Sequence, residues 1–458
     1  MGGAATVKEV TAAHAGPARP AREAALPLAG PEATPSTDLQ GLAEGLLERL
    51  RARGFAHAQV QASEDRRCEL NLAHNEPSLL RSNLARKVAA SAIVDGRRAS
   101  AQGTDLSDEG LERLVDELWS AAQAAPQDDA HAVSSGQHLQ LTRGPLQPDP
   151  QALSQALRTL LDWRATHTPT MMIEEATAAH RRERALVLTT GGSHLEKDLG
   201  WLEMSVFGLA REGEHASSFN YAGGNADSLA SVPLAFGLAR MMRDLTRQVR
   251  TRPLGERFVG DVVLAPGAVT DLLEWLTRQI GDGPLIDGSS LYRHKVGEMI
   301  ASPLLTLQSR YDAPGCSPVT GDAFVAPPVR LLDAGRLTQL APSLYGSRKT
   351  GVPHTPLGEG WELMPGDTPL ADMIASVPRG AIVDRLSMGS PGPNGDFSGV
   401  IKNSFRIDGG HMGDALAETM ISGNVARMLL DVAAVSAERI DSGSQALPWV
   451  RISGLNFS

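Results

Sequence analysis

The side chains that could carry chemistry are thinly spread in this sequence, as its histidines show. The chain has 12 histidines, and no two of them lie three or four residues apart. No helical turn can therefore present two imidazoles to one metal ion, and the H-E-x-x-H motif and its form one residue longer are both absent. The G-x-S-x-G motif of serine hydrolases and the phosphate-binding G-x-x-x-x-G-K-[ST] motif are absent as well. Because all of these motifs are absent, none of them assigns a reaction to the chain.

The two cysteines, Cys68 and Cys316, belong to no recognisable nucleophile motif. Two cysteines this far apart in the sequence form neither a disulfide framework nor a cysteine-based zinc site, and this favours a reducing compartment. The first residues lack the basic region and apolar run of a signal peptide, and no stretch approaches the roughly 18 apolar residues that cross a membrane. We therefore expect a cytoplasmic protein.

The composition is that of a folded protein. Of 458 residues, 42% are hydrophobic and 21% are charged. Lysine and arginine number 43 against 53 aspartates and glutamates, a net charge of −10, which argues against direct contact with nucleic acid or an anionic membrane. With 46 glycines and 29 prolines, turns must be frequent and long helical bundles are not expected.

Apolar spacing and turn residues predict the elements that must position any site. Ser107 is expected to cap a helix, and Asp95-Gly96 to turn a hairpin. The exposed face of the helix expected at 231–249 is rich in arginine and is interpreted as solvated. Other helices are expected at 37–50 (ended by Gly54), 150–164 and 415–437, and after Pro266. Strands are expected within 58–72, 88–94, 171–222 and 258–264.

These elements predict an α+β protein, with an N-terminal mixed α/β region and a β-rich C-terminal domain that contains a few helices. The expected division is a disordered leader at 1–36, an N-terminal α/β domain at 37–123, a linker at 124–149, a middle strand-rich domain at 150–251, and the C-terminal β-rich domain at 252–458.

Several stretches of the C-terminal part resemble the TldD/PmbA family, once called modulators of DNA gyrase. They follow one another in the family's order, from the strand and helix that begin at Arg257 to the last strand. The stretches are 257–267, 287–290, 295–303, 345–349, 394–398, 418–424 and 452–454. Asn83-Leu-Ala and the Asp95-Gly96 hairpin extend the resemblance more weakly towards the N-terminus.

The resemblance implies a metallopeptidase that works as a TldD–TldE pair. The TldD branch has H-E-x-x-x-H in the helix after the strand, where two imidazoles bind zinc. Residues 265–276 occupy that helix here and contain no histidine. Asp271 and Glu274 are interpreted as exposed polar positions, since two carboxylates alone make a poor zinc site. The chain therefore resembles the TldE/PmbA branch, although 309–315 and 394–398 depart from the family pattern.

On this resemblance the chain is a metal-free subunit of a heteromeric TldD/TldE-type metallopeptidase that proteolyses unfolded or modified peptides. It helps to form the substrate chamber, and we expect no catalytic residue and no metal in it. Zinc is expected in a TldD-like partner, an extended peptide is the expected substrate, and a homodimer of the isolated chain is left open. The alternative is a diverged enzyme that tailors or trims a ribosomal peptide. A module acting on gyrase or DNA is disfavoured by the net charge.

Glycine-rich loops are the candidate peptide-binding or partner-binding residues, because free backbone groups can add an extended peptide as a strand. These candidates are Asn394, Gly395, Asp396, Phe397, Ser398, Ser422, Gly423 and Asn424. The alternative is that their glycines serve only tight turns.

Four further candidates carry charge or an imidazole. Arg348 and Lys349 either hold a peptide carboxylate or lie in a solvated loop. His354 and His411 either donate hydrogen bonds to a peptide held by the partner or are simply exposed.

Overall fold

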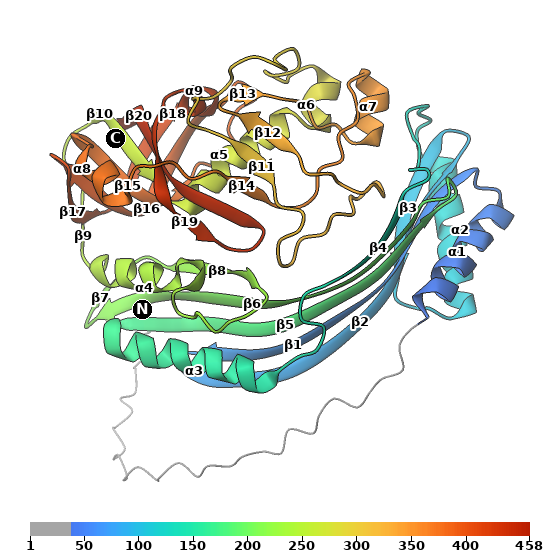
Figure 1. Cartoon of the computed structure of the whole chain (residues 1–458), viewed down its shortest axis with the longest axis horizontal. Helices are drawn as coiled ribbons and strands as arrows, with labels where there is room; N and C mark the ends of the chain where they lie inside the picture. The colour runs from blue at the N-terminus through green and yellow to red at the C-terminus, as the bar shows by residue number, and fades with distance from the viewer. Residues whose placement is uncertain (1–37) are drawn as a thin grey trace, which may run out of the picture. The chain divides into compact units, whose positions relative to one another are not determined.

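The computed structural model describes residues 38–458, which form one compact unit. The leader expected at 1–36 lies outside the described residues. The first half mixes helices with consecutive strands and the second half is rich in strands, so the predicted α+β class is confirmed (Figure 1). Among residues 38–458, no helix is long and apolar enough to cross a membrane.

The first half is built on one long-stranded sheet with four main helices. Its strands are β1 (His57–Ala73), β2 (Glu76–Val94), β3 (Arg97–Gly103), β4 (His138–Arg143), β5 (Met171–Thr189), β6 (His194–Glu212), β7 (His215–Ala216) and β8 (Asn220–Ala226). Its helices are α1 (Leu39–Arg53), α2 (Asp108–Ala124), α3 (Pro150–His167), η1 (Ala235–Gly237) and α4 (Leu238–Arg247).

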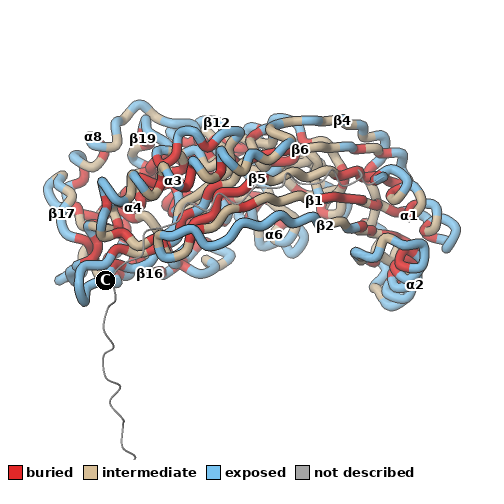
Figure 2. The backbone as a smooth tube through the Cα atoms, turned by 90° about the horizontal axis from the view of Figure 1, so that it is seen from below, coloured by how far each residue is buried: buried red, intermediate tan, exposed pale blue. Residues whose placement is uncertain are grey.

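This sheet has 8 strands in the order β3-β2-β1-β5-β6-β4, with β7 and β8 also paired to β6. The segment predicted as a linker, 124–149, contributes β4, which pairs in parallel with β6. β3 pairs only with residues 88–94 of β2, so residues 76–87 form an open edge, which Figure 2 shows as largely exposed. The domain boundaries at 123, 149 and 251 stay predictions.

Local signals for the helices of this half are confirmed. The Ser107 hydroxyl accepts a hydrogen bond from the Gly110 amide and caps α2. Gly54 ends α1 with φ 109°, a left-handed conformation that favours glycine. Helix α1 and helix α2 share one apolar core with β1–β3, and α3 and α4 share another with β5 and β6.

Charged side chains occupy the middle of the long strands, between these two cores. Glu64 and Glu69 are each 1% exposed. Arg66 and Arg86 lie 2.9 Å from the Glu64 carboxylate, and Arg67 lies 2.5 Å from that of Glu69. Buried carboxylates require such partners, so this network fixes the middle of the sheet.

The helix predicted at 231–249 is shorter than expected and its arginine face is only partly solvated. The α-helix covers 238–247, after the short turn η1. Arg243 and Arg247 are exposed, whereas Arg240 is half-buried and lies 4.4 Å from the Trp449 ring. Arg240 therefore contacts the second half of the chain, which a helix pattern alone does not reveal.

The second half contains a sheet of 12 strands and five short or medium helices. Its strands are β9 (Thr251–Arg252), β10 (Phe258–Leu264), β11 (Leu307–Ser309), β12 (Arg330–Asp333), β13 (Arg336–Leu337), β14 (Trp361–Leu363), β15 (Arg379–Ser387), β16 (Asp396–Asp408), β17 (His411–Leu416), β18 (Thr419–Asn424), β19 (Val432–Asp441) and β20 (Gln445–Phe457). Its helices are α5 (Pro266–Gln279), α6 (Asp282–Asp287), α7 (Leu344–Thr350), α8 (Leu370–Ala375) and α9 (Val425–Leu430).

The strand and helix that begin this half, β10 and α5, are confirmed. The helix predicted at 415–437 is wrong for most of that range, because only α9 (Val425–Leu430) is helical there and strands β18 and β19 lie on either side of it. Met420 is 43% exposed while Ile421 is fully buried, so burial alternates as in a strand. β18 lies between β16 and β20, and pairing with both outweighs a helical spacing of apolar residues.

Candidate functional site

The two glycine-rich candidate stretches lie side by side in the sheet. In the antiparallel pair of β16 and β18, Asp396 faces Asn424, Phe397 faces Gly423, and Ser398 faces Ser422. Two segments separated by more than twenty residues thus form one surface. This pairing uses one edge of each strand, and Ser422 of β18 also pairs with Asn456 of β20, so a peptide strand could be added here only along the other edge of β16.

The polar side chains of this surface bind one another. The Asn424 amide donates to the Asp396 carboxylate at 2.8 Å, and the Asn394 amide donates to it at 2.7 Å. These hydrogen bonds lower the pKa of Asp396, and the one from Asn424 has the largest effect. The Asn424 oxygen also accepts from the Arg427 amide and caps α9.

At Gly395 this surface packs closely against helix α5. Its φ is 91°, and a Cβ there would lie 3.1 Å from the Trp275 ring and 3.2 Å from the Asn424 side-chain oxygen. The Trp275 indole in turn donates to the Gly392 carbonyl at 3.4 Å. At this position the glycine serves the turn that the alternative interpretation expected.

Arg348 and Lys349 lie in helix α7 and contact the first half of the chain. The Lys349 ammonium lies 3.0 Å from the Asp128 carboxylate, and the Arg348 guanidinium donates to the Asp129 carbonyl at 2.9 Å. Hydrogen bonds from the Ala130 amide, and then from Lys349 and Tyr345, lower the pKa of Asp128 to about 2. Both cations therefore have protein partners.

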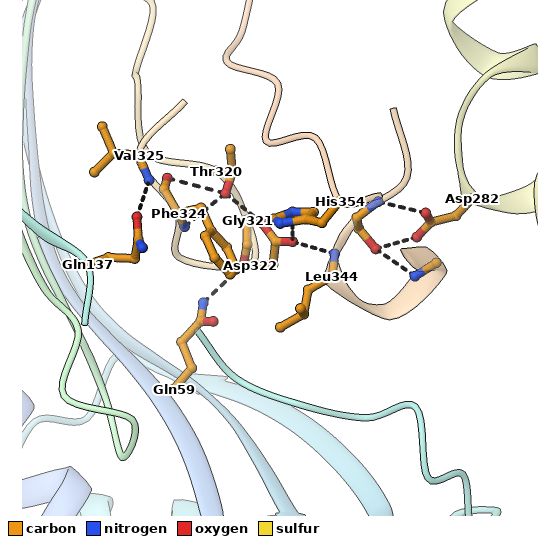
Figure 3. Close-up of polar contacts among 12 residues, drawn as sticks. Gln59, Gln137, Asp282, Thr320, Gly321, Asp322, Phe324, Val325, Leu344 and His354 are labelled. Carbon is orange, nitrogen blue, oxygen red and sulfur yellow. Dashed lines mark hydrogen bonds and ion pairs between the residues drawn. The ribbon is translucent and has the colours of Figure 1, made fainter. Parts of the chain in front are cut away.

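His354 holds a loop rather than projecting into solvent. Its Nε2 lies 3.2 Å from the Asp322 carboxylate, and its side chain is 16% exposed. Asp322 also accepts from the Leu344 amide at 2.8 Å, and the Gln59 amide donates to the adjacent Gly321 carbonyl at 3.0 Å (Figure 3). This loop therefore joins α7 to strand β1. His411 is exposed in the β16–β17 turn, away from these contacts.

A pocket of about 470 Å³ lies where the two halves meet. It is lined by β8, η1, α4, the first turns of α5, β15, β16 and the β19–β20 turn. None of the twelve candidate residues lines it. Its charged side chains are Asp271, Glu274, Asp384, Arg240, Arg385 and Lys402.

Asp271 is half-buried at this pocket, so its interpretation as an exposed position is wrong; Glu274 is exposed, as expected. Burial, and then the nearby Glu274 carboxylate, raise the pKa of Asp271 to about 6, against a smaller opposite effect of Arg385. A helix pattern places Asp271 on the polar side of α5, but only the packing of distant strands over that side buries it.

The residues of this pocket do not fit zinc. Zinc in proteins is bound mainly by imidazole and thiolate, and the lining contains neither histidine nor cysteine. Over residues 38–458, no group of three or more histidine, cysteine, aspartate or glutamate side chains is placed to hold a metal ion. The donors on α5 are the hydroxyl of Thr270 and the carboxylates of Asp271 and Glu274.

Comparison with solved structures shows the fold of nearly the whole chain. TldE from Thermococcus kodakarensis has a TM-score of 0.77 at 18% identity, covering 91% of this chain and 100% of its own. A putative modulator of DNA gyrase from Bacteroides thetaiotaomicron has a TM-score of 0.79 at 20% identity, covering 92% and 99%. Another from Thermotoga maritima has a TM-score of 0.73 at 16% identity, covering 92% and 100%.

Comparison with families identifies the second half. None of the curated proteins compared matches the sequence. Residues 258–458 match the PmbA/TldA metallopeptidase C-terminal domain, a stretch that runs from the first residue of β10 to the end of the chain. The resemblance of these C-terminal stretches to this family is therefore confirmed, and residues 258–458 form a domain of the PmbA/TldA metallopeptidase family.

Proposed function

We propose that this chain is the metal-free, TldE/PmbA-like subunit of a heteromeric peptidase. A TldD-like partner would carry the zinc and hydrolyse unfolded or modified peptides, and this chain would help to form the chamber that holds them. The supporting observation is the chemistry of α5. Where the TldD branch has paired histidines, α5 presents Thr270, Asp271 and Glu274 to the pocket.

The exposed candidate side chains fit a contact surface in such an assembly. Asp396 and Ser398 are exposed on β16 and Asn394 is exposed in the turn before it, where Gly395 packs against Trp275 of α5. We propose that these side chains contact the partner or the peptide. Ser398→Ala removes a hydroxyl that holds no turn together, and it should weaken assembly without altering the melting temperature.

The test is a comparison of the isolated chain with the assembled complex. The chain is purified alone and together with the TldD-like protein of the same cell, and bound zinc is measured by mass spectrometry. We expect zinc in the complex and none held tightly by the isolated chain, and hydrolysis of an unstructured peptide by the complex only. One zinc ion held tightly by the isolated chain would refute the proposal.

One observation supports the alternative, a diverged enzyme that trims or tailors peptides by itself. Asp271 is a half-buried carboxyl whose pKa, about 6, suits a group that both donates and accepts a proton near neutral pH. Turnover of a peptide by the isolated chain, lost in Asp271→Asn and retained in Glu418→Gln, would support this alternative. Equal turnover by both variants, or none by the wild type, would contradict it.

A further inference from the structure

The pocket beside α5 has walls of opposite charge. Asp271 and Glu274 project from one helix on one side. Arg385 of β15 and Lys402 of β16 line the same pocket and lie directly opposite each other in the antiparallel register. These two acids thus come from one element and these two bases from a neighbouring strand pair.

These walls are not joined by ion pairs. Among the described residues, no nitrogen of Arg385 or Lys402 lies within 4.0 Å of an oxygen of Asp271 or Glu274. Arg385 instead donates to the Phe219 carbonyl at 3.2 Å and lies 5.4 Å from the Tyr221 ring. In the described part of the chain no ion pair closes the pocket between these walls, and its volume of about 470 Å³ leaves room for another molecule.

The other two charged groups of the pocket have side-chain partners. The Asp384 carboxylate, next to Arg385 in β15, accepts a hydrogen bond from the Asn220 amide at 2.7 Å. Arg240 lies 3.2 Å from the Asp244 carboxylate. Within residues 38–458, the charged groups of the lining that form no hydrogen bond or ion pair with another side chain are therefore the two carboxylates on α5 and the two cations opposite them.

The size and the other lining residues limit what can fill the gap. About 470 Å³ is within the range of small-ligand pockets. Apolar side chains, among them Met241, Leu386 and Ile440, line the pocket as well. A ligand that matches both walls carries an ammonium group at one end, a carboxylate at the other, and an uncharged middle.

We propose that this pocket binds a short peptide with free ends, its amino terminus at Asp271 and Glu274 and its carboxylate at Arg385 and Lys402. The site goes beyond the proposed function because it needs only this chain. Hydrolysis of a longer peptide is the class of reaction that supplies such a ligand. The site would therefore retain a product of peptide hydrolysis.

Calorimetric titration of the isolated chain with trialanine tests the site. We expect saturable binding with a Kd of about 1 mM or tighter. N-acetyl-trialanine and trialanine amide should each bind about tenfold more weakly, because each lacks one charged end. These peptides test the site without altering the protein, so no folding defect affects the result. Equal affinity for the three peptides, or no saturable heat at about 10 mM, would overturn the proposal.

Two substitutions then assign the ends of the peptide. In Glu274→Gln, acetylating the amino terminus of trialanine should weaken its binding less than it does in the wild type. In Lys402→Gln, amidating the carboxyl terminus of trialanine should weaken its binding less than it does in the wild type. Glu117→Gln and Lys87→Gln are matched controls, since both residues are exposed and lie about a hundred residues or more before Asn220, the first lining residue in the sequence. Effects of acetylation and amidation that are unchanged in both pocket variants would place the peptide elsewhere. The zinc measurement on the complex does not depend on this outcome.

Discussion

Replacing Asp271 by asparagine should stabilise the fold at neutral pH. The carboxyl ionises near 3.8 when exposed and near 6 in the folded chain, chiefly because burial disfavours its charge. At neutral pH the folded state therefore holds a carboxylate that it solvates poorly. Asparagine has nearly the same shape and no charge, so it removes this cost.

The magnitude follows from the difference in pKa. About 2 pKa units correspond to about 3 kcal/mol as an upper bound. Asp271 is only half-buried, and solvent screening at the mouth of the pocket reduces the effect, so we expect about 1 kcal/mol. In a chain of this length that raises the melting temperature by about 1–2 °C.

The pH dependence has a definite sign. Between about pH 4 and 6 the folded chain keeps a proton that the unfolded chain has released, so the wild type loses stability as the pH rises through this window. The advantage of Asp271→Asn should therefore be about half its full value at pH 5 and constant above about pH 7.

Melting temperatures of the wild type, Asp271→Asn and the exposed control Glu418→Gln, measured by calorimetry from pH 5 to pH 8, test this reasoning. The control shows how much of any change comes from removing an exposed carboxylate alone. If Asp271→Asn shows no stabilisation at pH 7.5, or one that does not change with pH, burial does not set the ionisation of Asp271.

Three other substitutions test single contacts. Gly395→Ala should lower the melting temperature by several degrees, since its Cβ would lie 3.1 Å from Trp275 in a left-handed backbone, while Gly283→Ala, with nothing within 4 Å, should not. Asp128→Asn should raise deuterium uptake in α7, because it removes the negative charge that accepts hydrogen bonds from Tyr345 and Lys349 of that helix. Unchanged uptake would contradict this. Glu64→Gln should cost about 3 kcal/mol in urea unfolding, because this 1%-exposed carboxylate pairs with arginines; an unchanged midpoint would contradict this.

Local signals were enough to predict the elements whose ends are set by their own residues. Ser107 caps α2 and Gly54 ends α1 because a hydroxyl and a left-handed backbone act within a few residues. The helix predicted at 415–437 failed because β18 is stabilised by β16 and β20, whose partner residues lie elsewhere in the sequence. Long-range pairing of this kind leaves little local trace.

The pocket could not be predicted for the same reason. Asp271, Arg385 and Lys402 are separated by more than a hundred residues at the widest, and no motif links them. The resemblance to the TldD/PmbA family identified α5 by its missing histidines, and a missing side chain does not reveal a carboxyl that the fold buries on the same helix. What the structure adds is that strands β8 and β15 pack near the start of α5 and bury one carboxyl there.

The two proposals for α5 are connected by the chemistry of one position. Zinc held by imidazoles adds positive charge to a pocket, whereas carboxylates in the same place add negative charge and attract an ammonium group. The side chains that make α5 a poor zinc site are therefore those that make it a good partner for a peptide amino terminus. Asp271→Asn separates the two properties: it should leave zinc content unchanged while weakening the binding of trialanine above pH 6 more than that of its N-acetyl form. Near pH 5 Asp271 is largely protonated, so the difference in affinity between trialanine and its N-acetyl form should shrink in the wild type. The other charged groups that line the pocket are Glu274, Asp384, Arg385, Lys402 and Arg240.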